Sequence, residues 1–269
     1  MAIMISSLTR EGAAVTLRHI IRAYTTRRTL SATTQRKTSI SAPAPTSTAR
    51  QKPEARPAPA PAAASAAQLH AKHVTPTKPV DIVAIGVSTG GPNALAEVVP
   101  NLPGDLRVPV VIVQHMPPTF TAALAQSLDN KSALRVVEGE EGQVVEAGTV
   151  YIAPGGKHMK IVKRSSIDKA HLVLTEDPPE NHCRPAVDYL FRSVTKVYQD
   201  CALGVILTGM GADGALGLTE MKKWDIKAIV QDEETSVVFG MPQEAIKAGV
   251  VDTVQPLERI AAEIARMVG

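Results

Sequence analysis

The chain has 269 residues and a formal net charge of +3, and its charge is divided unevenly along the sequence. Residues 1–79 hold twelve of the 29 Lys and Arg residues but only two of the 26 Asp and Glu residues. The basic character therefore belongs to this segment, whose Ala-, Pro-, Ser- and Thr-rich composition cannot bury enough apolar surface to offset its ordering entropy. We expect a disordered basic extension or linker over 1–79 and a single folded domain over 80–269.

The composition also excludes several classes of protein. No apolar run is long enough to span a bilayer, and the first residues lack the apolar core of a signal peptide, although their Arg- and Thr-rich character also suits a transit peptide. The basic residues are dispersed without interleaved aromatic residues, which disfavours nucleic-acid binding. Cys183 and Cys201 form neither a disulfide framework nor a zinc pattern. We expect a cytoplasmic protein with reduced thiols, no membrane insertion and no nucleic acid as partner.

Apolar runs and turn residues predict strands that alternate with helices. The stretch 144–174 differs, because its alternating pattern and its turn signals predict short antiparallel strands or hairpins. Alternating strands and helices imply right-handed crossovers with helices on both sheet faces. We therefore predict an α/β fold, a three-layer α/β/α doubly wound domain with a mostly parallel sheet and a small antiparallel β excursion. The expected strands are 80–87, 108–114, 134–138, 201–207, 227–231 and 250–254, and the expected helices are 92–99, 119–128, 185–197, 214–224, 242–248 and 257–267.

Three polar residues follow three of these predicted strands, in turns marked by glycine or proline. They are Ser88, His115 and Asp213. Sites in open parallel sheets form at the carboxyl ends of the strands. A serine, a histidine and an aspartate at such ends are the components of a nucleophile, its general base and the group that orients the base. A serine hydrolase is the leading interpretation.

The segment around Ser88 matches the G-x-S-x-G pattern of a nucleophile elbow between a strand and a helix. Two alternatives are a glycine turn capped by a serine and a phosphate-cradling loop, although the segment lacks the P-loop lysine. The order Ser, His, Asp along the chain also differs from that of ordinary α/β-hydrolases.

His115 and Asp213 have simpler interpretations as well. A histidine at a strand end is often only a satisfied polar residue, and Asp213 is well placed to cap the helix that follows it. Three glycines in residues 209–214 exceed what a cap requires, and their amides suit an oxyanion hole or an anion site. No second histidine or carboxylate shows metal-ligand spacing nearby, so no metal is expected. Cys183 directly follows His182, but neighbouring strand residues point to opposite faces, which disfavours a Cys–His nucleophile there.

Together these segments resemble the catalytic domain of the CheB-type chemotaxis methylesterases. The matching stretches keep the family's order, and the match is specific because all of them occur in register. They are residues 84–92, 113–117, 151–155 with His158, 184–188, 205–214 and 238–242.

The resemblance implies a hydrolase that removes methyl groups from γ-glutamyl methyl esters of chemoreceptors, releasing methanol, and that also deamidates receptor glutamines. It implies Ser88 as nucleophile, His115 as general base and Asp213 as its orienter, with Thr89 and the backbone at Met210 as oxyanion or substrate-wall contacts. No cofactor is implied, and a monomer is expected. The rate is expected to rise with deprotonation of His115, with a pKa near the unperturbed value of about 6.5.

One departure from the family concerns regulation. Family members usually carry an N-terminal receiver domain that is phosphorylated on an aspartate, yet the first aspartate here is Asp81, inside the expected catalytic domain. We expect no receiver domain in this chain, which leaves constitutive activity, a separate regulatory or kinase component, or a fragment of a longer gene. Two other functions stay open, a non-catalytic phosphate- or nucleotide-binding module and an inactive domain that docks on receptor helices.

Overall fold

The computed structural model describes residues 74–165 and 167–269, so residues 1–73 of the expected extension lie outside the described residues. The strands are β1 (Ile82–Val87), β2 (Val110–Gln114), β3 (Arg135–Glu138), β4 (Thr149–Ile152), β5 (His158–Val162), β6 (His171–Thr175), β7 (Ala202–Ile206), β8 (Lys227–Gln231) and β9 (Thr253–Gln255). The helices are α3 (Gly91–Val98), α4 (Pro118–Asp129), α5 (Val187–Tyr198), α6 (Ala215–Lys222), α7 (Met241–Lys247) and α8 (Leu257–Val268), with a 3₁₀ turn η1 (Val99–Asn101) after α3.

Seven strands form one parallel sheet in the order β3-β4-β2-β1-β7-β8-β9. Strands β1, β2, β7 and β8 are buried along their whole length, as the continuous apolar runs predicted. The chain leaves β1 for β2 on one side and later returns to β7 on the other side, so the strand order reverses at β1. In doubly wound domains, ligands bind beyond the carboxyl ends of the strands at such a reversal, which here is the end of β1.

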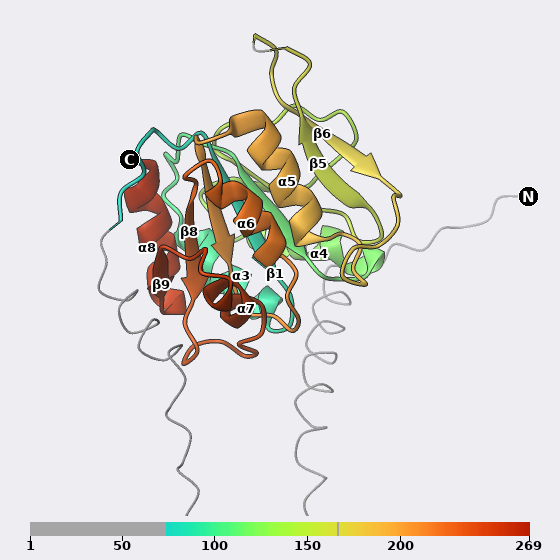
Figure 1. Ribbon diagram of the computed structural model, residues 1–269. Coiled ribbons are helices and arrows are strands. Elements are labelled where there is room, and N and C mark those ends of the chain that lie inside the picture. Colours follow the sequence, from blue (N-terminus) through green and yellow to red (C-terminus); the bar gives the residue numbers. More distant parts are fainter. Residues whose placement is uncertain (1–73, 166) are drawn as a thin grey trace, which may run out of the picture. The chain divides into compact units, whose positions relative to one another are not determined.

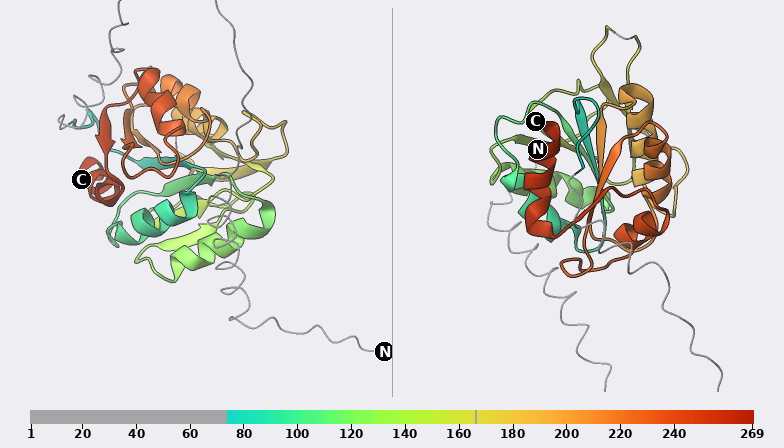
Figure 2. Two further views of the ribbon diagram at one scale, coloured as in Figure 1. Left: turned by 90° about the horizontal axis from the view of Figure 1, so that it is seen from below. Right: turned by 60° about the vertical axis from the view of Figure 1, so that its left-hand side comes forward.

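Helices cover both faces of this sheet, which confirms the predicted three-layer α/β/α architecture. One apolar cluster joins β1 and β2 to α3, α4 and α8, and a second joins the opposite face to α5, α6 and α7. The right-hand view of Figure 2 shows the strands between α8 (dark red) on one side and α5 and α6 (gold and orange) on the other. Among the described residues, every helix falls short of the length and apolar character that crossing a membrane takes.

The predicted antiparallel excursion is right for one part of residues 144–174 and wrong for another. Strands β5 and β6 form an antiparallel pair that lies beside α5 (Figure 1), and Ile161 N donates to Ser193 Oγ at 2.9 Å across that contact. Strand β4 instead inserts between β3 and β2 of the parallel sheet. All four of its residues are buried, and such a short run carries no periodicity that separates a central parallel strand from a hairpin arm.

Candidate active site

The three predicted site residues follow three adjacent strands. Ser88 comes directly after β1, His115 directly after β2, and Asp213 seven residues after the end of β7. Strand β1 lies between the other two, and its final residue Val87 pairs with Gln114 of β2. The fold therefore gathers Ser88, His115 and Asp213 at one edge of the sheet, at the reversal of strand order.

The Ser88 turn is fixed by its backbone on both sides. Ser88 N donates to Thr208 O at 3.0 Å, and Gln114 Nε2 donates to Ser88 O at 3.0 Å and to His115 O at 3.1 Å. The loop after β7 approaches this turn so closely that a Cβ on Gly209 would come within 2.8 Å of Ser88 Cβ. Gln114 thus ties the Ser88 turn to the His115 turn, a role that its place inside an apolar strand does not reveal in the sequence.

His115 and Asp213 are in direct contact. The Nε2 of His115 lies 2.8 Å from Oδ2 of Asp213, and the two side chains are 12% and 3% exposed. An ionised carboxylate only accepts hydrogen bonds, so Nε2 carries a proton and the neutral ring has its free lone pair on Nδ1. Nδ1 is therefore the atom that can accept a proton from a nucleophile.

The structure does not place the Ser88 hydroxyl in hydrogen-bond contact with this ring within the part of the chain that it describes. Nδ1 instead contacts the thiol of Cys183, whose Sγ lies 3.6 Å away. In the sequence, Cys183 stands beside His182. Its contact with His115 is not apparent there, because Cys183 and His115 are 68 positions apart. Catalytic hydrogen bonds are often long before substrate binds, so the Ser88 geometry does not exclude it as nucleophile.

The carboxylate of Asp213 is held by three further donors. Val187 N donates to Oδ2 at 2.7 Å, while Asp188 N and Asn181 Nδ2 donate to Oδ1 at 3.0 and 2.9 Å. The simpler interpretation of Asp213 as the cap of α6, the helix that follows it, is wrong. Its oxygens accept from the N-terminus of α5 and from His115 instead. Its place at the N-terminus of α5 favours the ionised carboxylate.

The N-terminus of α6 is capped by Asp188 from the neighbouring helix. Asp188 Oδ1 accepts from Gly214 N at 2.9 Å and Gly217 N at 2.6 Å, and Asn181 Nδ2 bridges Asp188 to Asp213. Burial, with the negative charge of Asp213 beside it, raises the pKa of Asp188. Burial acts in the same direction on Asp213, but its hydrogen bonds from His115 and backbone amides outweigh this and hold its pKa below the usual value.

Replacing Asp188 with alanine is expected to lower the free energy of unfolding by about 2–5 kcal/mol, because it leaves two buried amides at the start of α6 without an acceptor. Asp188→Asn keeps an oxygen for those amides and is expected to cost less. Chemical denaturation of both variants measures the difference. An alanine variant as stable as the wild type would show that Asp188 does not hold this helix.

Burial lowers the pKa of His115, but its hydrogen bonds to Asp213 and Cys183 and the charges of these groups outweigh burial and raise it to about 9. This differs from the ordinary value near 6.5 expected from the sequence, which placed Asp213 but not Cys183 beside the ring. The contact of the His115 imidazolium with Asp213 stabilises the fold fully below about pH 6.5, which is the pKa of histidine in the unfolded chain. This stabilisation is lost as the pH rises through about 9, the pKa of His115 in the folded protein.

The pH dependence of catalysis should follow from this pKa. Only the neutral ring accepts a proton, so kcat/KM for ester hydrolysis is expected to rise with pH, with a midpoint near 9. Cys183→Ala removes one of the partners that raise the pKa, and its midpoint should move to lower pH. The two proteins are compared by measuring rates from acid to alkaline pH and correcting each rate for spontaneous ester hydrolysis. A midpoint below 6.5 in the wild type, or the same midpoint in both proteins, would contradict this assignment.

Thr89 belongs to the Ser88 turn, and Met210 belongs to the loop after β7 that approaches this turn. Thr89 O accepts from Thr208 Oγ1 at 2.9 Å, which ties the Ser88 turn to the loop after β7. Within the described residues, the amides of Thr89 and Met210 donate to no protein atom, so both are free to face a substrate oxygen. Met210 is also among the most exposed large apolar side chains of the described residues, together with Val237.

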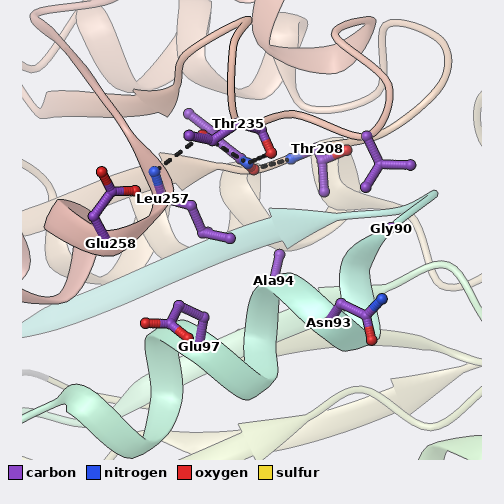
Figure 3. Close-up of a pocket in the computed structure, with 10 residues that line it drawn as sticks. Gly90, Asn93, Ala94, Glu97, Thr208, Thr235, Leu257 and Glu258 are labelled. Carbon is purple, nitrogen blue, oxygen red and sulfur yellow. Dashed lines mark hydrogen bonds between the residues drawn. The ribbon is translucent and has the colours of Figure 1, made fainter.

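A pocket of about 310 Å³ lies next to the Ser88 turn, between the start of α3 and the start of α8 (Figure 3). Gly90 and Thr208 form its boundary with the turn, and Glu97 and Glu258 give it an acidic far end. Taken over the described residues, its lining includes none of Ser88, His115 and Asp213. Ser88, His115 and Asp213 therefore lie outside this pocket, after the carboxyl ends of β1, β2 and β7.

Fold and site together define a class: doubly wound α/β domains with an imidazole–carboxylate pair at the reversal of strand order, next to a serine turn. A family model described as CheB methylesterase matches residues 83–264, and the chain belongs to this family.

The crystal structure of the CheB methylesterase catalytic domain from Thermotoga maritima is similar to this chain at 42% identity with a TM-score of 0.68, covering 71% of this chain and all of that one. Proteins named protein-glutamate methylesterase/protein-glutamine glutaminase are also similar. The one from Desulfotalea psychrophila is 52% identical over 188 residues, covering 70% of this chain and 52% of its own length. The one from Bacillus subtilis is 49% identical over 185 residues, covering 68% and 51%. The chain thus spans about half the length of the curated relatives it matches.

Proposed function

We propose that this protein is a methylesterase that hydrolyses γ-glutamyl methyl esters in chemoreceptors and also deamidates receptor glutamines, acting in the cytoplasm. The observation that carries the proposal is the His115–Asp213 contact at 2.8 Å on the two strands that flank β1, whose end bears Ser88. The relatives named for both reactions support the same assignment.

The reaction begins at Ser88, whose Oγ attacks the ester carbonyl carbon while its proton passes to Nδ1 of His115. Asp213 holds the Nε2 proton, so the ring keeps the tautomer that accepts at Nδ1, and it stabilises the imidazolium that forms. The amides of Thr89 and Met210 donate to the oxyanion. His115 then returns the proton to the departing methoxide. Methanol leaves the site, and the glutamyl acyl group remains bound to Ser88.

Water completes the turnover by the same steps. His115 takes a proton from water, the hydroxide attacks the acyl group, and Ser88 leaves with that proton as glutamate is released. With glutamine in place of the ester the leaving group is ammonia, so the same residues serve both reactions.

A protein substrate suits the exposure of the site. Met210 and Val237 are exposed apolar residues close to the Ser88 turn. Met210 follows Gly209, on which a Cβ would lie 2.8 Å from Ser88 Cβ, and a Cβ on Gly90 would lie 2.6 Å from Val237 Cβ. Exposed apolar groups around an open site favour docking of a protein surface. Phosphate or nucleotide binding is disfavoured, because the glycine loop after β7 carries the ionised Asp213 beside Asp188, and carboxylates repel phosphate.

Methanol release from a methylated chemoreceptor fragment tests the proposal. We expect the full chain to release methanol from the methylated fragment and ammonia from the fragment with glutamine at the same positions. A fragment with glutamate there controls for background. Release of neither product, with the protein folded, would contradict the proposed activity.

A further inference from the structure

The pair formed by Cys183 and His115 has the spacing of two ligands of one metal ion. Sγ and Nδ1 lie 3.6 Å apart. Zinc binds cysteine sulfur at about 2.3 Å and histidine nitrogen at about 2.0–2.1 Å with tetrahedral geometry, and two such bonds place the sulfur and the nitrogen about 3.5 Å apart. The side chains therefore need no large movement to accept the ion.

Asp213 lies in the same cluster, since one ligand atom each of His115, Cys183 and Asp213 falls within 4.8 Å of the others. Its oxygens are nevertheless occupied, because Oδ1 and Oδ2 together accept from two backbone amides, Asn181 and the His115 ring. Asp213 is thus placed to accept a hydrogen bond from Nε2 of His115 while Nδ1 binds a metal ion. This carboxylate–histidine–zinc arrangement fixes the ring and raises its basicity as a ligand.

The position of Cys183 is fixed, and solvent can reach it. Cys183 N donates to Glu180 O at 2.8 Å, and Glu180 N donates to Cys183 O at 3.1 Å, which closes a tight turn around the thiol. Both Cys183 and His115 are partly exposed, so an ion can enter from solvent without opening the core. The Asp213 carboxylate behind them adds negative charge that favours a cation.

We propose that Nδ1 of His115 and Sγ of Cys183 bind Zn²⁺, with Asp213 as the outer partner of the histidine, and that the bound ion inhibits the enzyme. Binding releases the thiol proton to solvent and fills the Nδ1 lone pair, which then cannot take the proton of Ser88. Two protein ligands leave the remaining positions to water, so chelators remove the ion. The inhibitory part rests on the proposed function, whereas metal binding does not.

Cobalt binding by the full chain tests the site independently of activity. Co²⁺ alone serves as the probe, because a bound thiolate gives a sulfur-to-cobalt charge-transfer band in the near ultraviolet. The band is expected in the wild type and in the matched control Cys201→Ala, whose cysteine lies at the opposite end of β7. It should be absent in Cys183→Ala, and Zn²⁺ should displace it in the wild type. A wild type without the band, or a Cys183→Ala variant that keeps it, overturns the proposal.

Methanol release measured with and without Zn²⁺ tests the inhibition, with each variant compared with itself. We expect the wild type and Cys201→Ala to lose activity in Zn²⁺ and to regain it with a chelator. Cys183→Ala lacks a direct ligand and should need at least the roughly 10–100 times more zinc that loss of an outer partner alone requires. Equal zinc sensitivity of Cys183→Ala and the wild type would overturn the proposal. A protein that shows the cobalt band but releases no methanol without zinc would refute the proposed function and leave the metal site standing.

Discussion

Replacing Ser88 with alanine is expected to reduce methanol release by about 10⁶-fold, the size of loss seen when a serine nucleophile is removed from a triad. The variant lacks the oxygen that forms the acyl group, whereas His115 and Asp213 keep their contact. Its thermal unfolding should match that of the wild type, because the turn is held by the backbone of Ser88 rather than by its hydroxyl. Turnover of a methylated receptor fragment measures the loss.

The matched control for this experiment is Cys183→Ala, because the Cys183 thiol also faces Nδ1 of His115. This variant should remain active and become faster near neutral pH, since losing the thiol lowers the pKa of His115. The opposite pattern, an active Ser88→Ala and an inactive Cys183→Ala, would identify the cysteine as the nucleophile and refute the serine mechanism.

Asp213→Asn is expected to lower kcat by about 10⁴-fold, as the equivalent change does in a serine-protease triad. An amide group facing Nε2 donates a proton, so the neutral ring would carry its own proton on Nδ1. Nδ1 would then have no lone pair for the Ser88 proton. The asparagine oxygen at the Oδ1 position still accepts from Asp188 N, while Val187 N loses its acceptor at the Oδ2 position. The fold should therefore persist with a free energy of unfolding lower by about 1–3 kcal/mol.

Kinetics and unfolding must be measured together on the Asp213→Asn variant. A large loss of kcat in a protein that stays fully folded under the assay conditions supports the tautomer argument. A loss that is explained by unfolding, or a loss of less than about tenfold, would show that Asp213 is structural.

Most of the fold is predictable from the sequence, because buried parallel strands appear as continuous apolar runs and their ends carry glycine or proline. This is why the predicted strand at 108–114 contains β2, and why Ser88, His115 and Asp213 were assigned to strand ends. Strand β4 was not predicted in the sheet, since four buried residues among turn signals resemble a hairpin arm. Sheet order depends on contacts between distant residues, which no local pattern reports.

The candidate site was predictable only in its principal residues. Their roles remain predictions, although the contact of His115 with Asp213 agrees with them. The residues around them were not predicted, because their sequence signals are weak. Gln114 is a polar residue inside an apolar strand, and Asp188 resembles an ordinary carboxylate in the first turn of a helix. The pKa of His115 also depends on Cys183, and no pattern in the sequence places this residue beside that ring.

Mapping a covalent adduct tests most directly whether Ser88 is the nucleophile activated by His115 and Asp213. The full chain is treated with a fluorophosphonate, which reacts with activated serines, and the modified peptide is located by mass spectrometry. We expect loss of methanol release in step with one adduct on Ser88, and a much slower reaction in Asp213→Asn. An adduct on any other residue that accompanies inactivation, or full activity after Ser88 has been modified, would contradict it.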